Sequence, residues 1–209
     1  ADPLHSLPVG QAAGLVVIDF TTRRRVRING ALTASDEAGM TLDVDQAYGN
    51  CPQYIHQRHI TVGEKPPQPD RTLQYDGNRL RGEDIRLIES ADTFFLGTTH
   101  PEAGNDASHR GGPAGFVRVT DERLWWPDYP GNNMFNSFGN LAVDPTAALL
   151  FVDFRTGDTL QLSGTATVDW AAPAEDDDQT GRRGLFTPRQ VVATAIPDLT
   201  NPARAGQHE

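Results

Sequence analysis

Two neighbouring segments hold most of the residues whose types could do chemistry. The first, residues 104–119 (GNDASHRGGPAGFVRV), places Ser108, His109 and Arg110 before a pair of glycines. Glycines let backbone N–H groups come close to a ligand, and a planar guanidinium suits a phosphate. The second, residues 124–145, holds four asparagines beside glycines, and such a loop offers amide and backbone donors to an anion. Together they favour a phosphate site over a set of plain turns.

Short β-rich runs separated by turn signals must position these segments. We predict strands at 14–20, 26–32, 92–99, 115–119, 122–126, 148–154 and 159–168. The glycine-rich segment then falls in a loop between two strands. One helix is expected at 82–91, where apolar residues recur three apart and acids stand in the first turn. Many short strands with Gly and Pro turns indicate a closed or partly closed barrel.

The first and last predicted hairpins repeat each other at a constant offset. Asp19 and Asp153 differ by 134 positions (153 − 19), and Gly30 and Gly164 differ by the same number. Between them, apolar residues face apolar ones and the turn keeps its place. We interpret this match as an internal duplication rather than chance hairpin similarity. The second copy begins earlier than the first, so the first is expected to be incomplete: either a shortened chain or a natural half-barrel attached to a whole one.

The duplication divides the chain into four expected parts. Residues 1–62 form a partial first repeat, and residues 81–200 form a complete second repeat. Residues 63–80 are a linker, because their prolines block both helix and strand ladders. Residues 201–209 are a tail. The acidic run at 172–181 is expected to be a solvated loop.

Composition excludes several classes of protein. The 209 residues carry a net charge of −10 and are 37% hydrophobic, as in a soluble globular chain. No apolar run approaches the ~20 residues that span a bilayer, and the acidic balance argues against nucleic-acid binding. The single cysteine, Cys51, rules out an internal disulfide and agrees with a cytoplasmic location. Hydrolase, NTPase and Rossmann motifs are absent from the sequence.

Other polar residues leave alternatives open. His56 and His59 have helical metal-ligand spacing, but a zinc site needs a third ligand and Cys51 is the only soft residue nearby, so no metal site is expected. His109 could deliver a proton, contact a ligand or be an exposed loop histidine. The basic run 23–25 with Arg27 is either a solvated turn or a partner for acids of the other copy.

These motifs, taken in order, resemble a known family. The series strand, DASHRGGPAGFV, strand, PDYPGNNMFNSFGNLAVDP, strand LLFVDF is similar to the pyridoxamine 5′-phosphate oxidase-like, FMN-binding split-barrel family. It is most similar to the branch of flavin-nucleotide-binding proteins in which the barrel is duplicated. The resemblance covers 85–167 and, as the partial first copy, 14–57, where NCPQYI at 50–55 is typical of that branch.

The resemblance implies a fold and a place for the cofactor. The fold would be mainly β: a duplicated FMN-binding split β-barrel with an incomplete first copy and short helices. FMN would lie in the cleft between two barrels. The two barrels would come either from one chain, as a pseudo-dimer, or from a homodimer.

The resemblance also implies site residues. Arg110 and Ser108 would bind the phosphate, and Asn132 and Asn133 would stand where the family has an Arg-Lys pair. Thr159 would replace a flavin-contacting glutamine. The full expected cofactor set adds the glycine pair and residues facing the ring: Asn50, Gln53, Ser108, His109, Arg110, Gly111, Gly112, Tyr129, Asn132, Asn133 and Thr159.

The implied function is an FMN-dependent oxidoreductase. It would move a hydride or an electron pair from a reductant such as NAD(P)H to oxygen or a small-molecule acceptor, and no catalytic acid or base is assigned. The family's substrate-phosphate residues have no match near the C-terminus, so pyridoxamine 5′-phosphate is not the expected substrate. The alternatives are a non-catalytic flavin or haem carrier, with His109 as the first axial candidate, and a ligand-free interaction module.

Overall fold

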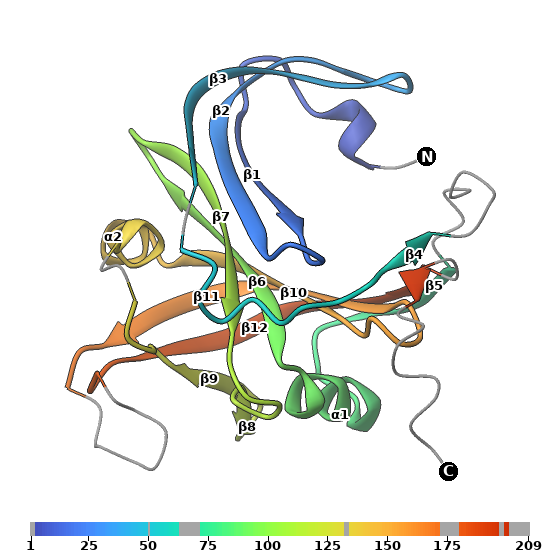
Figure 1. Cartoon of the computed structure of the whole chain (residues 1–209), viewed down its shortest axis with the longest axis vertical. Helices are drawn as coiled ribbons and strands as arrows, with labels where there is room; N and C mark the ends of the chain where they lie inside the picture. Colours follow the sequence, from blue (N-terminus) through green and yellow to red (C-terminus); the bar gives the residue numbers. More distant parts are fainter. Residues whose placement is uncertain are drawn as a thin grey trace.

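A computed structural model describes residues 3–49, 51–62, 72–131, 134–171, 180–196 and 199–200. The predicted mainly β class is confirmed, since antiparallel sheets make up most of the described chain. A three-stranded sheet stands over a larger eight-stranded one, and the two are built from opposite ends of the chain (Figure 1).

The small sheet has the order β1-β2-β3. Its strands are β1 (Ala12–Asp19), β2 (Arg24–Asp36) and β3 (Gly39–Gly49), and a short 3₁₀ helix, η1 (Pro3–Ser6), precedes them. In β1 the apolar side chains at 15 and 17 are exposed, while their neighbours at 16 and 18 are half-buried. This alternation is the period of two that a strand requires.

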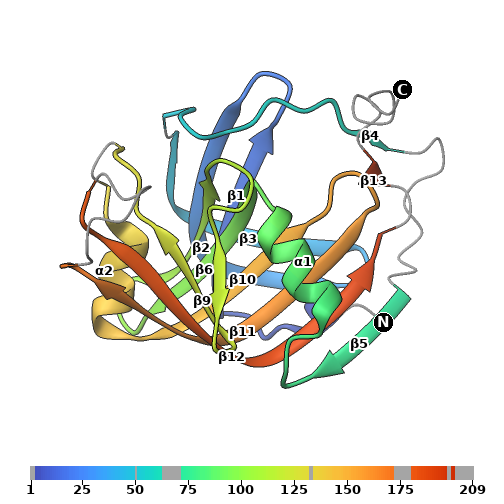
Figure 2. The same ribbon diagram turned by 90° about the horizontal axis from the view of Figure 1, so that it is seen from below.

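The large sheet has the order β7-β6-β10-β11-β12-β9-β8, with β5 also paired to β12. Its strands are β5 (Thr72–Gly77), β6 (Thr93–His100), β7 (Gly104–Gly111), β8 (Arg118–Thr120), β9 (Arg123–Pro127), β10 (Thr146–Val152), β11 (Asp158–Asp169) and β12 (Arg183–Ala195). Two helices, α1 (Gly82–Ser90) and α2 (Asn136–Val143), lie near opposite ends of this sheet (Figure 2). A further pair, β4 (Thr61–Val62) with β13 (Leu199–Thr200), is separate.

The hydrophobic core belongs to the large sheet. It is centred on aromatic rings, with Phe94 stacked on Phe116 and Phe151 and edge-on to Trp126. Each of these four side chains is at most 2% exposed. Close packing on this scale fixes the strands that carry the site.

The two sheets contain the same hairpin. In the small sheet Leu15 pairs with Ile28, and in the large sheet Leu149 pairs with Leu162, which are the same two positions shifted by 134. The turn between the strands also repeats, because Arg23 and Gly157 both have a positive φ, of 56° and 80°. The register therefore supports the duplication.

A β-bulge repeats as well. The ladder shifts register between Asn29 and Gly30 in β2, and between Ser163 and Gly164 in β11. A Cβ on either glycine would lie about 2 Å from a facing carbonyl oxygen, at 1.9 Å for Gly30 and 2.1 Å for Gly164. Glycine is thus required at both bulges because the neighbouring strand comes too close for any side chain. Among the described residues, the small sheet has counterparts of β10, β11 and β12 only.

The seam between the sheets is closely packed and polar. A Cβ on Gly14 of β1 would lie 2.7 Å from the carbonyl oxygen of Asn105 in β7, so the two strands cross almost in contact. Arg27 of β2 forms a buried ion pair with Asp106 of β7 at 2.8 Å, and Ser137 of α2 donates to the same carboxylate at 2.9 Å. The prediction that the basic run pairs with acids of the other copy is confirmed for Arg27.

Two predictions about loops are wrong. The glycine-rich segment is not a loop: residues 104–111 form β7, which pairs with β6 along its whole length. The polar residues at 105 and 106 find partners across the seam, and Ser108 finds Ser137 within its own repeat, which offsets their low strand propensity. Asn136 and Asn140 stand on helix α2 rather than in a loop, and they donate to Tyr48 and Thr98.

Several other expectations can be placed. The predicted helix at 82–91 is confirmed as α1, which ends at Ser90. Trp126 of β9 is buried and Trp125 is half-buried. Part of the expected linker, Thr72–Gly77, is strand β5 and pairs with β12. Residues 63–71 and most of the acidic run lie outside the described residues. In the part of the chain that the structure describes, the helices are all too short and too polar to cross a bilayer.

Candidate functional site

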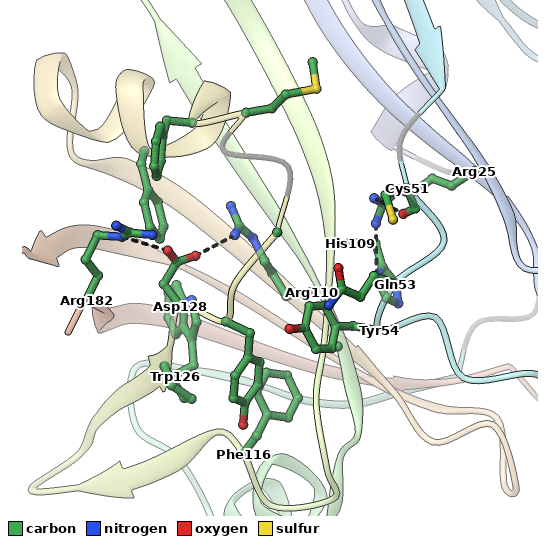
Figure 3. A pocket seen from close by; sticks show the side chains of 17 residues that line it. Arg25, Cys51, Gln53, Tyr54, His109, Arg110, Phe116, Trp126, Asp128 and Arg182 are labelled. Atoms are coloured by element: carbon green, nitrogen blue, oxygen red, sulfur yellow. Dashed lines mark hydrogen bonds and ion pairs between the residues drawn. The ribbon is translucent and has the colours of Figure 1, made fainter. Parts of the chain in front are cut away.

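A cavity of about 130 Å³ opens where the C-terminal end of β7 meets the first repeat (Figure 3). The first repeat supplies Arg25 of β2 and the segment 51–54, and the second repeat supplies β7, β9, α2 and Arg182. The cavity is therefore built from both copies, at the seam between them.

A carboxylate between two guanidiniums forms one end of the cavity. Asp128 follows β9, and its Oδ2 lies 2.9 Å from Nε of Arg182. Its Oδ1 lies 3.7 Å from Nη1 of Arg110, the last charged residue of β7. Figure 3 shows all three side chains converging on one point. Arg182 is well paired, whereas Arg110 has only this long contact to a carboxylate among the described residues.

Arg110, like Arg25, is a cation of the cavity that is short of an anionic partner among the described residues. Its Nε is buried and makes no hydrogen bond to a described residue. Burial lowers the pKa of Arg110 to about 10, even though Asp128 acts in the opposite direction. Its guanidinium also lies over the ring of Phe138, 5.0 Å from the centroid. A charge that has lost water and gained one long ion pair is poised to bind a second anion.

A second cationic group stands at the other end. Arg25 donates from Nη1 to Nδ1 of His109 at 3.3 Å and from Nη2 to the carbonyl of Cys51 at 3.2 Å. Burial, together with the charge of Arg25, lowers the pKa of His109 to about 3, so the imidazole is neutral. Because a guanidinium can only donate, Nδ1 accepts and Nε2 carries the proton. His109 is thus a buried neutral strand residue and not an exposed loop histidine.

Charge and aromatic surface together define what the cavity can hold. Among the described lining residues, three guanidiniums face one carboxylate, which leaves two positive charges. Aromatic rings make up much of the remaining wall: Tyr54, Phe116, Trp126, Tyr129, Phe135 and Phe138. A phosphate monoester carries about −1.5 to −2 at neutral pH, and an aromatic wall suits a planar group. The described lining therefore combines a net positive charge that suits a phosphate with rings that suit a planar group.

Tyr54 closes one side of the cavity. Its ring stacks on Tyr129 with centroids 5.3 Å apart, and its hydroxyl donates to the carbonyl of Pro130 at 2.8 Å. Its φ is +65°, a left-handed conformation that costs a non-glycine residue energy. A Cβ on Gly111 would lie 2.0 Å from the Tyr54 carbonyl oxygen, so this glycine admits the segment.

The structure brings several predicted site residues to the cavity. Gln53, His109, Arg110, Gly111 and Tyr129 all line it. Glycine at position 112 lets two aromatic rings of the protein come close to the backbone. A Cβ on Gly112 would lie 2.7 Å from ring atoms of Phe116 and Tyr129. Asn50, Asn132 and Asn133 lie outside the described residues.

Three described residues of the predicted set do not line the cavity: Ser108, Gly112 and Thr159. Ser108 is 3% exposed and its hydroxyl lies 3.1 Å from that of Ser137, within the seam and not among the cavity lining. Thr159 is also buried, and its hydroxyl lies 2.6 Å from that of Thr194. The repeat explains the displacement of Thr159, because the same position in the first copy is Arg25 (159 − 134), and Arg25 does line the cavity. The cavity lies between the two copies, and at this position the hairpin of the first copy contacts it and the hairpin of the second does not.

Sequence reasoning missed three charged residues of the site: Arg25, Asp128 and Arg182. The repeat offset applied to Thr159 could have found Arg25. Nothing in the sequence marks Arg182, which stands 72 positions (182 − 110) from Arg110. In the described part of the chain, no three His, Cys, Asp or Glu side chains are grouped to hold a metal ion. His56 lies 2.8 Å, through Nε2, from the carbonyl of Gly112.

Comparison with known families identifies the fold. The model of the pyridoxamine 5′-phosphate oxidase family matches residues 82–189, which is more than half of the chain. The chain belongs to this family, whose members share the split-barrel fold. No curated protein matches the sequence.

Solved structures give more distant similarities. HupZ of Group A Streptococcus is 12% identical, with a TM-score of 0.44, over 58% of this chain and 98% of its own. HutZ, the haem storage protein of Vibrio cholerae, is 12% identical, with a TM-score of 0.41, over 56% and 95%. An FAD binding protein of Mycobacterium smegmatis is 10% identical, with a TM-score of 0.37, over 57% and 98%. All three scores are below 0.5, so the assignment rests on the family model.

Proposed function

We propose that this protein binds FMN at the seam cavity, with Arg110 as the main contact to the phosphate. The observation that supports this most directly is the state of Arg110. It is partly removed from water, no described residue accepts a hydrogen bond from its Nε, and its carboxylate contact is 3.7 Å long. A phosphate oxygen offers the charge-assisted hydrogen bonds that this guanidinium lacks.

The chain's residues fit the phosphate end of FMN better than its ring. Two uncompensated positive charges match a phosphate monoester. Sites for whole drug-sized ligands measure roughly 300–1,000 Å³, whereas this cavity measures about 130 Å³. The ring therefore needs the Tyr54 side to open. Gln53 and Cys51, which line that side, would then face the ring.

The redox function that we propose comes from the family resemblance and not from the geometry of the site. FMN, when bound, supplies the hydride or electron-pair chemistry, and the chain binds and orients it. The neutral state of His109 means that this residue holds Arg25 through Nδ1 and is not a cationic acid at neutral pH. We propose an oxidoreductase acting from a reductant such as NAD(P)H to oxygen or a small-molecule acceptor.

Titrating the purified protein with FMN and with riboflavin, which lacks the phosphate, tests the proposal. FMN should bind more tightly than riboflavin, and Arg110→Ala should weaken FMN binding by roughly tenfold to a hundredfold while leaving riboflavin unchanged. Arg79→Ala is the matched control, since Arg79 pairs with Glu122 on the exposed surface. Equal binding of the two flavins, or no effect of Arg110→Ala, would reject the site.

Steady-state assays separate enzyme from carrier. With FMN bound, an oxidoreductase consumes NADH or NADPH in the presence of oxygen or an added acceptor. A protein that binds FMN and leaves both reductants untouched is a carrier instead. A haem carrier would show a Soret band in place of flavin absorbance.

A further inference from the structure

Asp128 occupies the position in the cavity where an incoming anion would be most stable. Its two carboxylate oxygens face Arg182 at 2.9 Å and Arg110 at 3.7 Å. Only 11% of the side chain is exposed, so water screens these contacts weakly. A ligand phosphate that bridges the same two guanidiniums must take the place of this carboxylate.

Hydrogen bonds fix the backbone of Asp128, whereas its carboxylate is held by the two guanidiniums. Its N–H donates to the carbonyl of Arg182 at 2.9 Å, and the Thr180 hydroxyl donates to its carbonyl at 2.5 Å. These bonds continue the pairing of β9 with β12 and hold the Cα in place. Among the described residues the carboxylate has no partner besides these two guanidiniums, so rotation about Cα–Cβ is enough to move it off both.

Electrostatics explains why a carboxylate lies between the two guanidiniums. Without it, the guanidiniums of Arg110 and Arg182 would share a partly desolvated cavity with no counter-ion, and the Arg25 charge already disfavours the charged form of Arg110. An unpaired buried charge is strongly destabilising. Asp128 therefore stabilises the protein before the ligand arrives, and the same stabilisation must be given up when it binds.

We propose that Asp128 is a built-in counter-ion that competes with the ligand's phosphate for Arg110 and Arg182, so that the flavin is exchangeable and not permanently held. This inference rests on the proposed function. If Asp128 competes in this way, the flavin dissociates readily, as a substrate or a carried ligand does. The binding free energy of the phosphate is reduced by the ion pairs that it replaces.

Charge-swap variants test the competition. Asp128→Asn should tighten FMN binding about tenfold and slow its release, with riboflavin binding unchanged. Arg182→Gln leaves Asp128 paired with Arg110 alone and should weaken FMN binding about tenfold. The double variant Arg182→Gln with Asp128→Asn restores the original net charge and should return FMN affinity to near the wild-type value. The rescue keeps the test decisive if Asp128→Asn alone folds poorly.

The matched control is Asp169→Asn, because Asp169 pairs with Arg183 at 3.3 Å and is not among the cavity lining. It should leave both flavins' affinities unchanged. Weaker FMN binding in Asp128→Asn, or no rescue in the double variant, would show that Asp128 positions the arginines and would overturn the inference. In that case the wild type would still bind FMN more tightly than riboflavin. If the proposed function were wrong, the wild type would bind the two flavins equally.

Discussion

The ring of Phe20 packs edge-on against the ring of Phe154, with centroids 5.2 Å apart, and the two residues hold the same position in the two repeats. Each follows an aspartate whose carboxylate accepts from a backbone N–H of the turn: Asp19 is the last residue of β1, and Asp153 comes directly after β10. The Arg58 guanidinium lies over both rings, at 5.4 and 4.5 Å from the centroids. Self-contact between equivalent residues is what a local two-fold relation between two units produces.

The bulge glycines give the first prediction. Gly30→Ala and Gly164→Ala should each lower the free energy of unfolding by about 1–3 kcal/mol, because a methyl group would overlap a facing carbonyl. Gly139→Ala is the control, since a Cβ there meets nothing within 4 Å inside helix α2. It should raise stability by about 0.5–1 kcal/mol. Urea denaturation of the three variants measures these free energies of unfolding. If either bulge variant were as stable as Gly139→Ala, the requirement for glycine at both bulges would be contradicted.

The seam ion pair gives the second prediction. Asp106→Asn should destabilise the protein by about 3–5 kcal/mol, because it leaves Arg27 buried and unpaired. Both side chains are at most 6% exposed. The exposed pair of Arg79 and Glu122 provides the control, and Arg79→Gln should change stability by about 0–1 kcal/mol. A small effect of Asp106→Asn in thermal or urea denaturation would mean that the seam does not depend on this pair.

The third prediction concerns pH. The pKa of His109 is lowered by burial from 6.5 to about 3, so the unfolded chain takes up its proton first as the pH falls. Stability should therefore decrease below pH 6.5, by about 1.4 kcal/mol per pH unit down to pH 3 from this residue. His109→Gln should flatten that part of the pH profile, whereas the exposed His59→Gln should not. Identical profiles for the wild type and His109→Gln would contradict the buried neutral imidazole.

The fourth prediction concerns entry to the cavity. Tyr54→Phe removes the hydrogen bond to Pro130, and Tyr54→Ala also removes the stack on Tyr129. FMN association and dissociation should both become faster, and more so in the alanine variant, because the Tyr54 side opens more easily. Stopped-flow fluorescence follows both rates. Tyr75→Phe, outside the cavity, should leave them unchanged; an effect on dissociation alone would make Tyr54 a binding surface and not a gate.

The sequence by itself determined the repeat and the class of fold. Identical residues at a fixed spacing, such as Asp19 with Asp153 and Gly30 with Gly164, carry local requirements for a turn and a bulge. Such requirements act within one hairpin, so they are visible in one stretch of chain. The guanidinium of Arg110 was identified in the same way, from its neighbours in the sequence.

Tertiary structure decided which residues meet that guanidinium. Ser108 shares a face of β7 with Arg110 but lies further along the strand, where its hydroxyl meets that of Ser137. The crossing of the two sheets brings Arg25 to the cavity in place of Thr159. Asp128 and Arg182 come together because β9 pairs with β12. These contacts join residues far apart in the chain, and their position depends on sheet register and packing, which no local pattern encodes.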